Sequence, residues 1–361
     1  MPRVIGIDPG TVSIDLCGLE DGRVFLDRTF PTTAALADPA GFIAMLAAAG
    51  PLDLIVGPSG YGLPLTNARD ATDEDLRLAF LAAPGEPGGI AGIAGLARAL
   101  ARSELPVVFT PGVIHLVSVP EHRKVNRVDM GTADKVAATA LAIDAQARRR
   151  GCAPADVSLV LLELGGAFTA AVAVTGGRIV DGIGGTAGPL GFRAAGALDG
   201  EVAFLAGAVQ KELLFSGGAA AVAGWDVDVV PAEQIAHPRT ARERVAFDAL
   251  VEGAAKAASA LALSIPAPCE FVLSGRLARL PRVQDAVAQL LERLGPVRRV
   301  DGVASVAKEG AQGAALLADG LAGGTHRIVV DTLGLREAQG SVIDHLYVVS
   351  PAAARRRLGF S

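Results

Sequence analysis

An acidic residue stands at the end of a short apolar run near the start of the chain. In segment 6–13, Asp8 is followed by a turn at Gly10 and then by the hydroxyl groups of Thr11 and Ser13. Exposed backbone NH groups, hydroxyl groups and a carboxylate suit phosphate oxygens and a bridging Mg²⁺. Asp-Pro-Gly is also a common tight turn, so these residues alone leave a turn-capping role for Asp8 open.

The second half of the chain repeats this arrangement. Glu163 stands at a predicted strand end, Gly165 and Gly166 follow it, and Thr169 supplies a hydroxyl group. Two opposed hairpins of this kind could hold a polyphosphate from both sides. The repeat therefore favours phosphate binding over two unrelated turns.

A third glycine turn consists of Ser274, Gly275 and Arg276. It follows a buried strand predicted for 270–273 and precedes a helix predicted for 281–294. Because glycine has no side chain, a flat base could approach the backbone at this turn. Taken alone, the turn is a weak signal.

Acidic residues also lie at the start of two predicted helices. Asp134 is in the first turn of a helix predicted from Thr132 to Arg149, where the positive helix end stabilises a carboxylate. It either faces a cleft or only stabilises the helix. Glu309 and Gly310 open a helix predicted for 308–321, whose small residues three positions apart favour close backbone packing.

The loop of Ser59, Gly60 and Tyr61 follows a short buried strand predicted for 52–56. We expect these residues to line an acceptor pocket, and a Pro/Gly-rich surface turn is the alternative.

These candidate residues must be positioned by strands and helices that alternate along the chain. Three strands are predicted at the start, and three more follow the same order in the second half, which indicates an internal repeat. We therefore predict an α/β protein of two duplicated domains that face an interdomain cleft. The predicted strands of the repeat are 3–7, 14–19, 23–30, 158–163, 168–174 and 178–180. Further predicted helices are 34–49, 90–101 and 240–264, and further predicted strands are 107–110, 328–330 and 345–349.

We predict an N-terminal domain at 1–150 and a C-terminal domain at 151–307. The helix and tail at 308–361 are predicted to pack back on the N-terminal domain. A length of 361 residues agrees with about two domains.

Composition excludes several classes of protein. No uncharged run of about 18 residues and no signal peptide is seen, so we expect a cytoplasmic protein without a membrane partner. A net charge of −5 argues against a nucleic-acid partner. The 3 cysteines lack ligand spacing, so neither zinc nor an iron–sulfur cluster is expected. We expect a small-molecule substrate, and a homodimer is left open.

The glycine turns and helix starts occur in an order that resembles the acetate/sugar kinase, Hsp70 and actin superfamily. Segment 7–13, the glycine-rich block 165–182 and the following Arg193 look like butyrate kinases. A Glu-Leu-Gly sequence at 163–165 replaces the His-Leu-Gly of acetate and butyrate kinases. The resemblance implies ribonuclease H-like domains, ATP and Mg²⁺ as cofactors, and phosphorylation of a small carboxylate.

It also implies roles for single residues. Asp8 and Glu309 would hold Mg²⁺, Arg193 would contact the transferred phosphoryl group, and Asp134 would orient or deprotonate the acceptor, with Asp129 as its substitute. Nucleotide-binding residues would be the following: Gly10, Thr11, Ser13, Gly165, Gly166, Thr169, Ser274, Gly275, Arg276 and Gly310. A kinase for a hydroxyl acceptor, a nucleotide-dependent switch or scaffold ATPase, and a noncatalytic polymerising protein are the alternatives.

Overall fold

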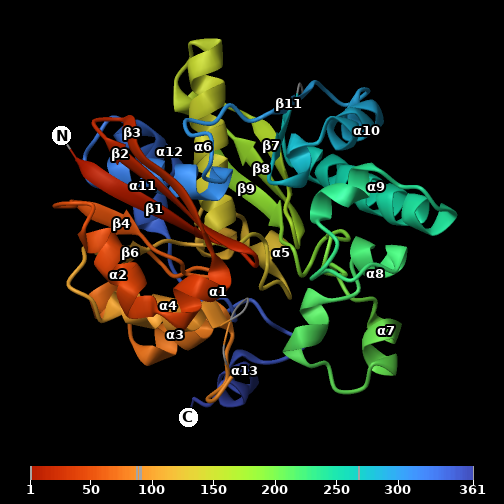
Figure 1. The fold of residues 1–361 in the computed structure, drawn as a ribbon, viewed down its shortest axis with the longest axis horizontal. Helices are drawn as coiled ribbons and strands as arrows, with labels where there is room; N and C mark the ends of the chain where they lie inside the picture. Colours follow the sequence, from red (N-terminus) through yellow and green to blue (C-terminus); the bar gives the residue numbers. More distant parts are fainter. Residues whose placement is uncertain (1, 87, 89–91, 267–268, 361) are drawn as a thin grey trace. The chain divides into compact units, whose positions relative to one another are not determined.

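The start and the end of the chain belong to one unit. The computed structural model describes residues 2–86, 88, 92–266 and 269–360 (Figure 1). Contacts divide the chain into two units. Unit 1 is Met1–Val157, Gly176–Ile179 and Asp301–Ser361, and unit 2 is Ser158–Thr175 and Val180–Val300.

A mixed sheet forms the described centre of unit 1. Its strand order is β3-β2-β1-β4-β6-β5, with an antiparallel meander of β1 to β3 and parallel pairing of β1, β4 and β6. The inner strands are buried on both faces, which explains why the residues of β1 are almost continuously apolar. The strands are β1 Arg3–Pro9, β2 Ser13–Glu20, β3 Arg23–Pro31, β4 Leu54–Val56, β5 Thr66–Asn67 and β6 Val107–Phe109.

Helix α11 (Glu309–Leu321) is the central helix of unit 1, buried along almost its whole length. It packs against β1 and β2 and also against α6 (Ala133–Arg150). A Cβ atom at Gly6 would lie 2.1 Å from the backbone nitrogen of Ala315, and one at Gly313 would lie 1.9 Å from the carbonyl oxygen of Ala137. Glycine at these two positions therefore permits the close approach of α11 to the sheet and to α6.

The remaining helices of unit 1 surround this core (Figure 1). Long apolar residues of α4 (Ile93–Ala101) cover the sheet, and its predicted start at Ile90 lies outside the described residues. The others are α1 Thr32–Ala37, α2 Pro39–Ala47, α3 Asp73–Phe80, α5 Glu121–Lys124, α12 Arg327–Leu333 and α13 Pro351–Arg357.

Unit 2 repeats the topology that surrounds β1. Its described sheet has the order β11-β10-β7-β8-β9, so an antiparallel meander again lies beside a parallel strand. Helices α9 and α10 pack on this sheet and enclose the aromatic residues Phe192, Phe247 and Phe271. The strands are β7 Leu159–Leu164, β8 Thr169–Thr175, β9 Arg178–Ile183, β10 Phe271–Ser274 and β11 Val297–Arg299. The helices are α7 Gly200–Leu205, α8 Ala219–Ala223, α9 Ala241–Ala262 and α10 Pro281–Leu291.

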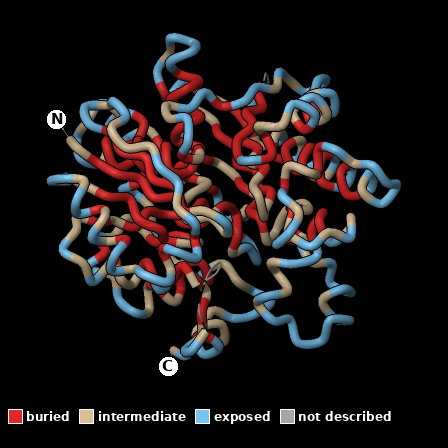
Figure 2. The backbone as a smooth tube through the Cα atoms, in the orientation of Figure 1, coloured by how far each residue is buried: buried red, intermediate tan, exposed pale blue. Residues whose placement is uncertain are grey.

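The mixed α/β fold with a duplicated meander confirms the prediction of fold class. The cores of both sheets are buried, whereas α7 has no buried residue (Figure 2). No helix in the described part of the chain is long and apolar enough to cross a membrane.

Both strands predicted in the tail are wrong. Residues 328–330 lie in α12, which ends at Gly334 with a φ of 69°. The segment 345–349 contains no strand, and the Oδ1 atom of Asn126 accepts hydrogen bonds from the NH groups of Tyr347 and Val348. β-branched residues suggest strands, but burial of one helical face outweighs that preference in α12.

The single helix predicted for 34–49 is two helices, α1 and α2. Asp38 separates them with a non-helical φ of −135° and accepts a hydrogen bond from the NH group of Gly41. Pro39 occupies the first turn of α2, where its missing NH group costs nothing.

Candidate functional site

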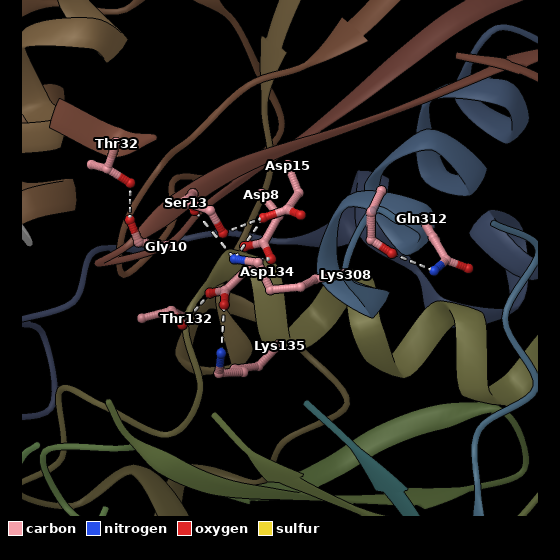
Figure 3. Close-up of polar contacts among 11 residues, drawn as sticks. Asp8, Gly10, Ser13, Asp15, Thr32, Thr132, Asp134, Lys135, Lys308 and Gln312 are labelled. Atoms are coloured by element: carbon pink, nitrogen blue, oxygen red, sulfur yellow. Dashed lines mark hydrogen bonds and ion pairs between the residues drawn. The ribbon is translucent and has the colours of Figure 1, made fainter. Parts of the chain in front are cut away.

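Two carboxylates face each other across the first hairpin. Asp8 on β1 pairs in register with Asp15 on β2, and both are buried. Like charges directly opposite in a sheet are destabilising unless a cation lies between them. Lys308 supplies this cation, because its Nζ atom lies 2.9 Å from Asp15 Oδ2 and 3.4 Å from Asp8 Oδ2 (Figure 3).

The turn between β1 and β2 completes the surroundings of this ammonium group. Lys308 Nζ donates to the carbonyl oxygen of Ser13 over 3.3 Å, and the Ser13 hydroxyl donates to Asp15 over 2.9 Å. The NH group of Gly10 closes the turn on the same Ser13 carbonyl at 2.9 Å. A Cβ atom at Gly10 would lie 2.5 Å from Lys308 Nζ, so the glycine leaves the space that the ammonium group fills.

The loop that carries Lys308 is fixed by two side chains. Asp27 accepts hydrogen bonds from the consecutive backbone NH groups of 305–307, at distances down to 2.7 Å. Desolvation disfavours the charged form of Asp27, but these hydrogen bonds outweigh it and lower its pKa. Gln312 accepts from the NH groups of 303–304 and donates to two carbonyl oxygens of the same loop. The irregular loop is therefore held in place before α11 begins.

Asp134 adds a third carboxylate from the first turn of α6 (Figure 3). Thr132 donates its hydroxyl to Asp134 Oδ1, and Lys135 Nζ lies 2.5 Å from Asp134 Oδ2. Burial raises the pKa of Asp134, but the charge and hydrogen bond of Lys135 and the Thr132 hydroxyl lower it below its ordinary value. Asp134 is therefore ionised at neutral pH.

Asp8 behaves in the opposite way. Burial raises its pKa; Lys308 and Lys135 oppose that rise, and the negative charges of Asp134 and Asp15 add to it. The net direction is upward. Neighbouring carboxylates with opposite shifts of pKa are typical of functional sites, although structural ion pairs also produce them.

The start of α11 lies directly on Asp8. A Cβ atom at Gly310 would lie 2.8 Å from Asp8 Cγ, so only glycine leaves the carboxylate its present position. Glu309, the first residue of α11, is buried beside Gly310 and Lys308 in sequence. Sequence analysis predicted Asp8, Asp134, Glu309 and Gly310, and the fold of unit 1 gathers them around the starts of α6 and α11.

The predicted acceptor loop also reaches the start of α6. The carbonyl oxygen of Gly60 accepts a hydrogen bond from the NH group of Ala133 at 3.0 Å. Ser59 is buried and donates to the carbonyl oxygen of Thr110, and Asp129 accepts from the NH group of Gly131. Both side chains thus hold loops in place. Tyr61 and Thr11, also predicted, are both partly exposed.

In unit 2 the two predicted glycine turns lie side by side. Gly275 has a φ of 90°, and a Cβ atom there would lie 2.6 Å from the carbonyl oxygen of Leu164. Gly165 closes the β7–β8 turn through a 2.9 Å hydrogen bond to the carbonyl oxygen of Phe168. A Cβ atom at Gly166 would lie 3.7 Å from the Arg276 side chain. The carboxyl ends of β7 and β10 therefore form one platform of glycine turns.

Two buried hydroxyl groups lie at this platform. Thr169 Oγ1 and Ser274 Oγ have no hydrogen-bond partner within the described ranges of the chain. The two predicted arginines are occupied locally: Arg276 forms an ion pair with Glu233, and Arg193 donates to the carbonyl oxygen of Val227 at 2.9 Å. Arg193 also lies 3.8 Å from the exposed Asp228.

The carboxylates of unit 1 suit a magnesium ion. Mg²⁺ prefers oxygen ligands, and proteins often hold it with one or two carboxylates while phosphates and water complete its shell. Asp8 and Glu309 provide such oxygens. Among the residues that the structure describes, no three acidic, histidine or cysteine side chains form a complete metal cage. Asp8, in contact with the start of α11, has the oxygen chemistry that an ion shared with a phosphate ligand requires.

Sequence analysis missed Asp15 and Lys308. Asp15 could have been found from the hairpin itself, because a tight turn at 10–12 pairs it with Asp8. Lys308 precedes the positive end of α11, where a cation is unfavourable unless carboxylates surround it. The unfavourable position of Lys308 before a helix start was the signal in the sequence that could have identified it as a site residue.

Comparisons with known proteins agree with the fold. Residues 6–348 match the family described as "Protein of unknown function (DUF1464)". No curated protein matches the sequence. Among solved structures, a propionate kinase from Francisella tularensis subsp. tularensis SCHU S4 is similar, with a TM-score of 0.59 and 12% identity over 87% of this chain and 99% of that chain.

Two acetate kinases are similar as well. The enzyme from Entamoeba histolytica has a TM-score of 0.57 and 11% identity over 81% of this chain and 87% of that chain. The enzyme from Porphyromonas gingivalis has a TM-score of 0.57 and 14% identity over 87% of this chain and 98% of that chain. At such identities the comparison establishes that the chain shares the fold of these acetate and propionate kinases, and nothing about the substrate.

Proposed function

The chain belongs to the DUF1464 family, and we propose that it is a phosphotransferase that uses ATP and Mg²⁺ to phosphorylate a small molecule. The observation that carries this proposal is the charge cluster at the turn after β1, in which the buried Asp8 and Asp15 meet the partly exposed Asp134 and Lys308. Burial of so many charges is costly, and a structural core would be more stable with apolar residues in their place. A charged ligand that binds this cluster would offset that cost.

Phosphoryl transfer depends mainly on positioning and on neutralisation of charge. An oxygen atom of the acceptor forms a bond to the γ-phosphorus, the bond from that phosphorus to the β–γ bridging oxygen breaks, and ADP leaves with the electron pair. Asp8 and Glu309 would hold the Mg²⁺ ion, which when bound neutralises polyphosphate charge. Lys308 and Lys135 supply further positive charge.

For the nucleotide we propose the glycine platform of unit 2. Gly165, Gly166 and Gly275 have no side chains that would block a base or a phosphate. The buried hydroxyl groups of Thr169 and Ser274, which lack a partner among the described residues, would rotate toward the ligand to bond it. A buried hydroxyl without a partner costs about 1–3 kcal/mol, which a bound ligand would recover.

Arg193 keeps its proposed role in binding the phosphoryl group. Its 3.8 Å ion pair with Asp228 involves a largely exposed carboxylate. Such pairs contribute at most about 1 kcal/mol, so Arg193 could leave Asp228 at little cost.

We propose a small carboxylate as the acceptor, in the manner of the acetate and propionate kinases that share the fold. A carboxylate is already ionised at neutral pH and requires no general base. A hydroxyl acceptor is the second candidate, and the ionised state of Asp134 favours it. In that case Asp134 would accept the hydroxyl proton as the oxygen–phosphorus bond forms.

The test is ATP turnover with Mg²⁺ across a panel of short-chain carboxylates, hydroxy acids and sugars, with hydroxylamine to trap acyl phosphates. We would compare the wild type with Asp8→Ala and with Asp70→Ala, an exposed aspartate of unit 1 as control. Hydroxamate that forms with one carboxylate, persists in Asp70→Ala and disappears in Asp8→Ala supports an acyl kinase. Turnover without any acceptor indicates a switch or scaffold ATPase instead, and absence of nucleotide binding refutes both.

A further inference from the structure

Lys308 lies between two carboxylates, a position that the supply of positive charge alone does not explain. We propose that Lys308 binds the polyphosphate directly and that, without ligand, its ammonium group competes with a divalent cation for Asp8 and Asp15. This inference rests on the proposed function, because it assigns a further residue to the same phosphate site. The position of the ammonium group between the two carboxylates is the observation behind it.

The turn after β1 is surrounded by negative charge, and Lys308 is a cation in contact with it. Asp8, Asp15 and Asp134 surround the turn, and a polyphosphate would bring several further negative charges into the same space (Figure 3). Lys135 is already bound to Asp134 at 2.5 Å. Lys308 is the cation that touches the turn itself, through Ser13 and through the space left by Gly10. A phosphate that approached this turn would therefore meet the ammonium group of Lys308.

The backbone at Lys308 is fixed, whereas its side chain is partly exposed. Lys308 follows a loop whose backbone is held by Asp27 and Gln312, so the origin of its side chain is fixed. The side chain itself is 26% exposed, in contrast to the deeply buried Asp15. A fixed backbone with a partly exposed ammonium group suits a lysine that changes its partner while its loop stays still.

A divalent cation and the ammonium group of Lys308 would compete for the carboxylate of Asp8. Oxygen atoms of Asp8 are ligands of the kind that Mg²⁺ prefers, but the ammonium group now lies 3.4 Å from them. A divalent ion near Asp8 and the ammonium group repel each other, so each weakens the binding of the other. Removal of the ammonium group should therefore strengthen divalent binding while it weakens polyphosphate binding.

The experiment compares wild type, Lys308→Met and Lys124→Met by isothermal titration calorimetry. Lys124 is a matched control, because it is a buried lysine of unit 1 that donates to the carbonyl oxygen of Leu116. The probes are Mn²⁺ alone, and ATP and inorganic tripolyphosphate with EDTA present. Thermal unfolding monitors the fold of each variant.

In Lys308→Met we expect affinity for Mn²⁺ to rise about tenfold, the effect of removing one unit charge about 6 Å from a divalent ion in water. Affinity for tripolyphosphate and ATP should fall at least about tenfold. Lys124→Met should change neither. A fall in both affinities indicates a purely structural ion pair and overturns the proposal, and so do two unchanged affinities.

A double variant covers the case in which Lys308→Met does not fold. Lys308→Met with Asp15→Asn removes one charge of each sign, so that two buried carboxylates no longer face each other without a cation. It should bind tripolyphosphate more weakly than Asp15→Asn alone, and equal binding overturns the proposal. Binding of tripolyphosphate by the wild type, together with failure to bind ATP when Mg²⁺ is supplied in a separate titration, would refute the proposed function and leave the role of Lys308 standing.

Discussion

Replacement of Gly310 by alanine should separate activity from stability. The new Cβ atom would lie 2.8 Å from Asp8 Cγ and 2.9 Å from Asp8 Oδ2. Carbon atoms in contact prefer about 3.5–4.0 Å, so the carboxyl group must move by about 0.7 Å or more. It cannot do so freely, because Lys308 and Asp15 adjoin it.

The stability effects nearly cancel. Alanine is favoured over glycine by about 1 kcal/mol in a helix interior and by less at the second residue of α11, whereas overpacking of a core costs about 1–3 kcal/mol. We therefore expect a net loss of about 0–2 kcal/mol, which lowers Tm by about 0–8 °C. A displacement of about 1 Å at a reacting centre costs about 10²-fold in rate, so turnover should fall far more than stability.

The assay measures Tm and ATP turnover for wild type, Gly310→Ala and Gly95→Ala. Gly95 is the matched control, because it lies inside α4 and a Cβ atom there would meet nothing within 4 Å. Gly95→Ala should raise stability by up to about 1 kcal/mol and leave turnover unchanged. Turnover of Gly310→Ala within threefold of wild type, with normal ATP affinity, would show that the position of Asp8 does not matter to the reaction.

Three further changes test the charges of unit 1. Asp8→Asn should raise Tm at pH 7–8, because a carboxyl group with a raised pKa contributes stability below its unfolded pKa and loses it as the pH rises through its folded pKa. Mg²⁺-dependent turnover of Asp8→Asn should fall about 10²-fold or more. A lower Tm in this variant would contradict the argument. Asp319→Asn should cost about 1.5–3 kcal/mol at neutral pH, because Asp319 accepts from the NH group of His326 and lies 2.8 Å from its Nδ1 atom. Burial raises the pKa of Asp319, but the hydrogen bonds from His326 outweigh this and lower it. The difference in Tm between Asp319→Asn and wild type should therefore disappear only as the pH falls from about 3.9 through the lower folded pKa. Asp134→Asn should reduce the rate of phosphoryl transfer by about 10²–10⁴-fold if the acceptor is a hydroxyl group, and by less than about tenfold if it is a carboxylate. The rate is measured with the acceptor that the substrate panel identifies.

The sequence was sufficient for the parts of the fold that local patterns determine. The hairpin of β1 and β2 follows from two short apolar runs joined by a glycine turn, and its recurrence at β7 and β8 indicated the duplication. The helix α9 was predicted within a few residues from its alanine-rich sequence, and the structure shows that Thr240 caps it and Glu243 completes the capping box. The tail failed because burial of Val329 and Val330 on one helical face depends on contacts that no local pattern contains.

The candidate site divides in the same way. Asp8 was predicted because it ends an apolar strand before a glycine turn, which is a local signal. Lys308 was missed because its role depends on a contact between residues that are far apart in the chain, whereas Asp15 required only the register of the hairpin. Lys308 reaches Asp15 only after the packing of α11 against the sheet brings the loop 303–307 to Asp27.

The small residues at the start of α11 serve both the packing of the helix and the formation of the site. Gly313 lets α11 approach α6, and Gly310 lets the same helix approach Asp8. The first contact fixes the helix and the second places its positive end on a carboxylate, where the helix dipole opposes the burial cost of that charge. A residue larger than glycine at either position would move Lys308 and Glu309 away from Asp8. Close packing is therefore the means by which the site is assembled, and a sequence pattern that indicates packing at a helix start beside an acidic strand end should be examined as part of a site.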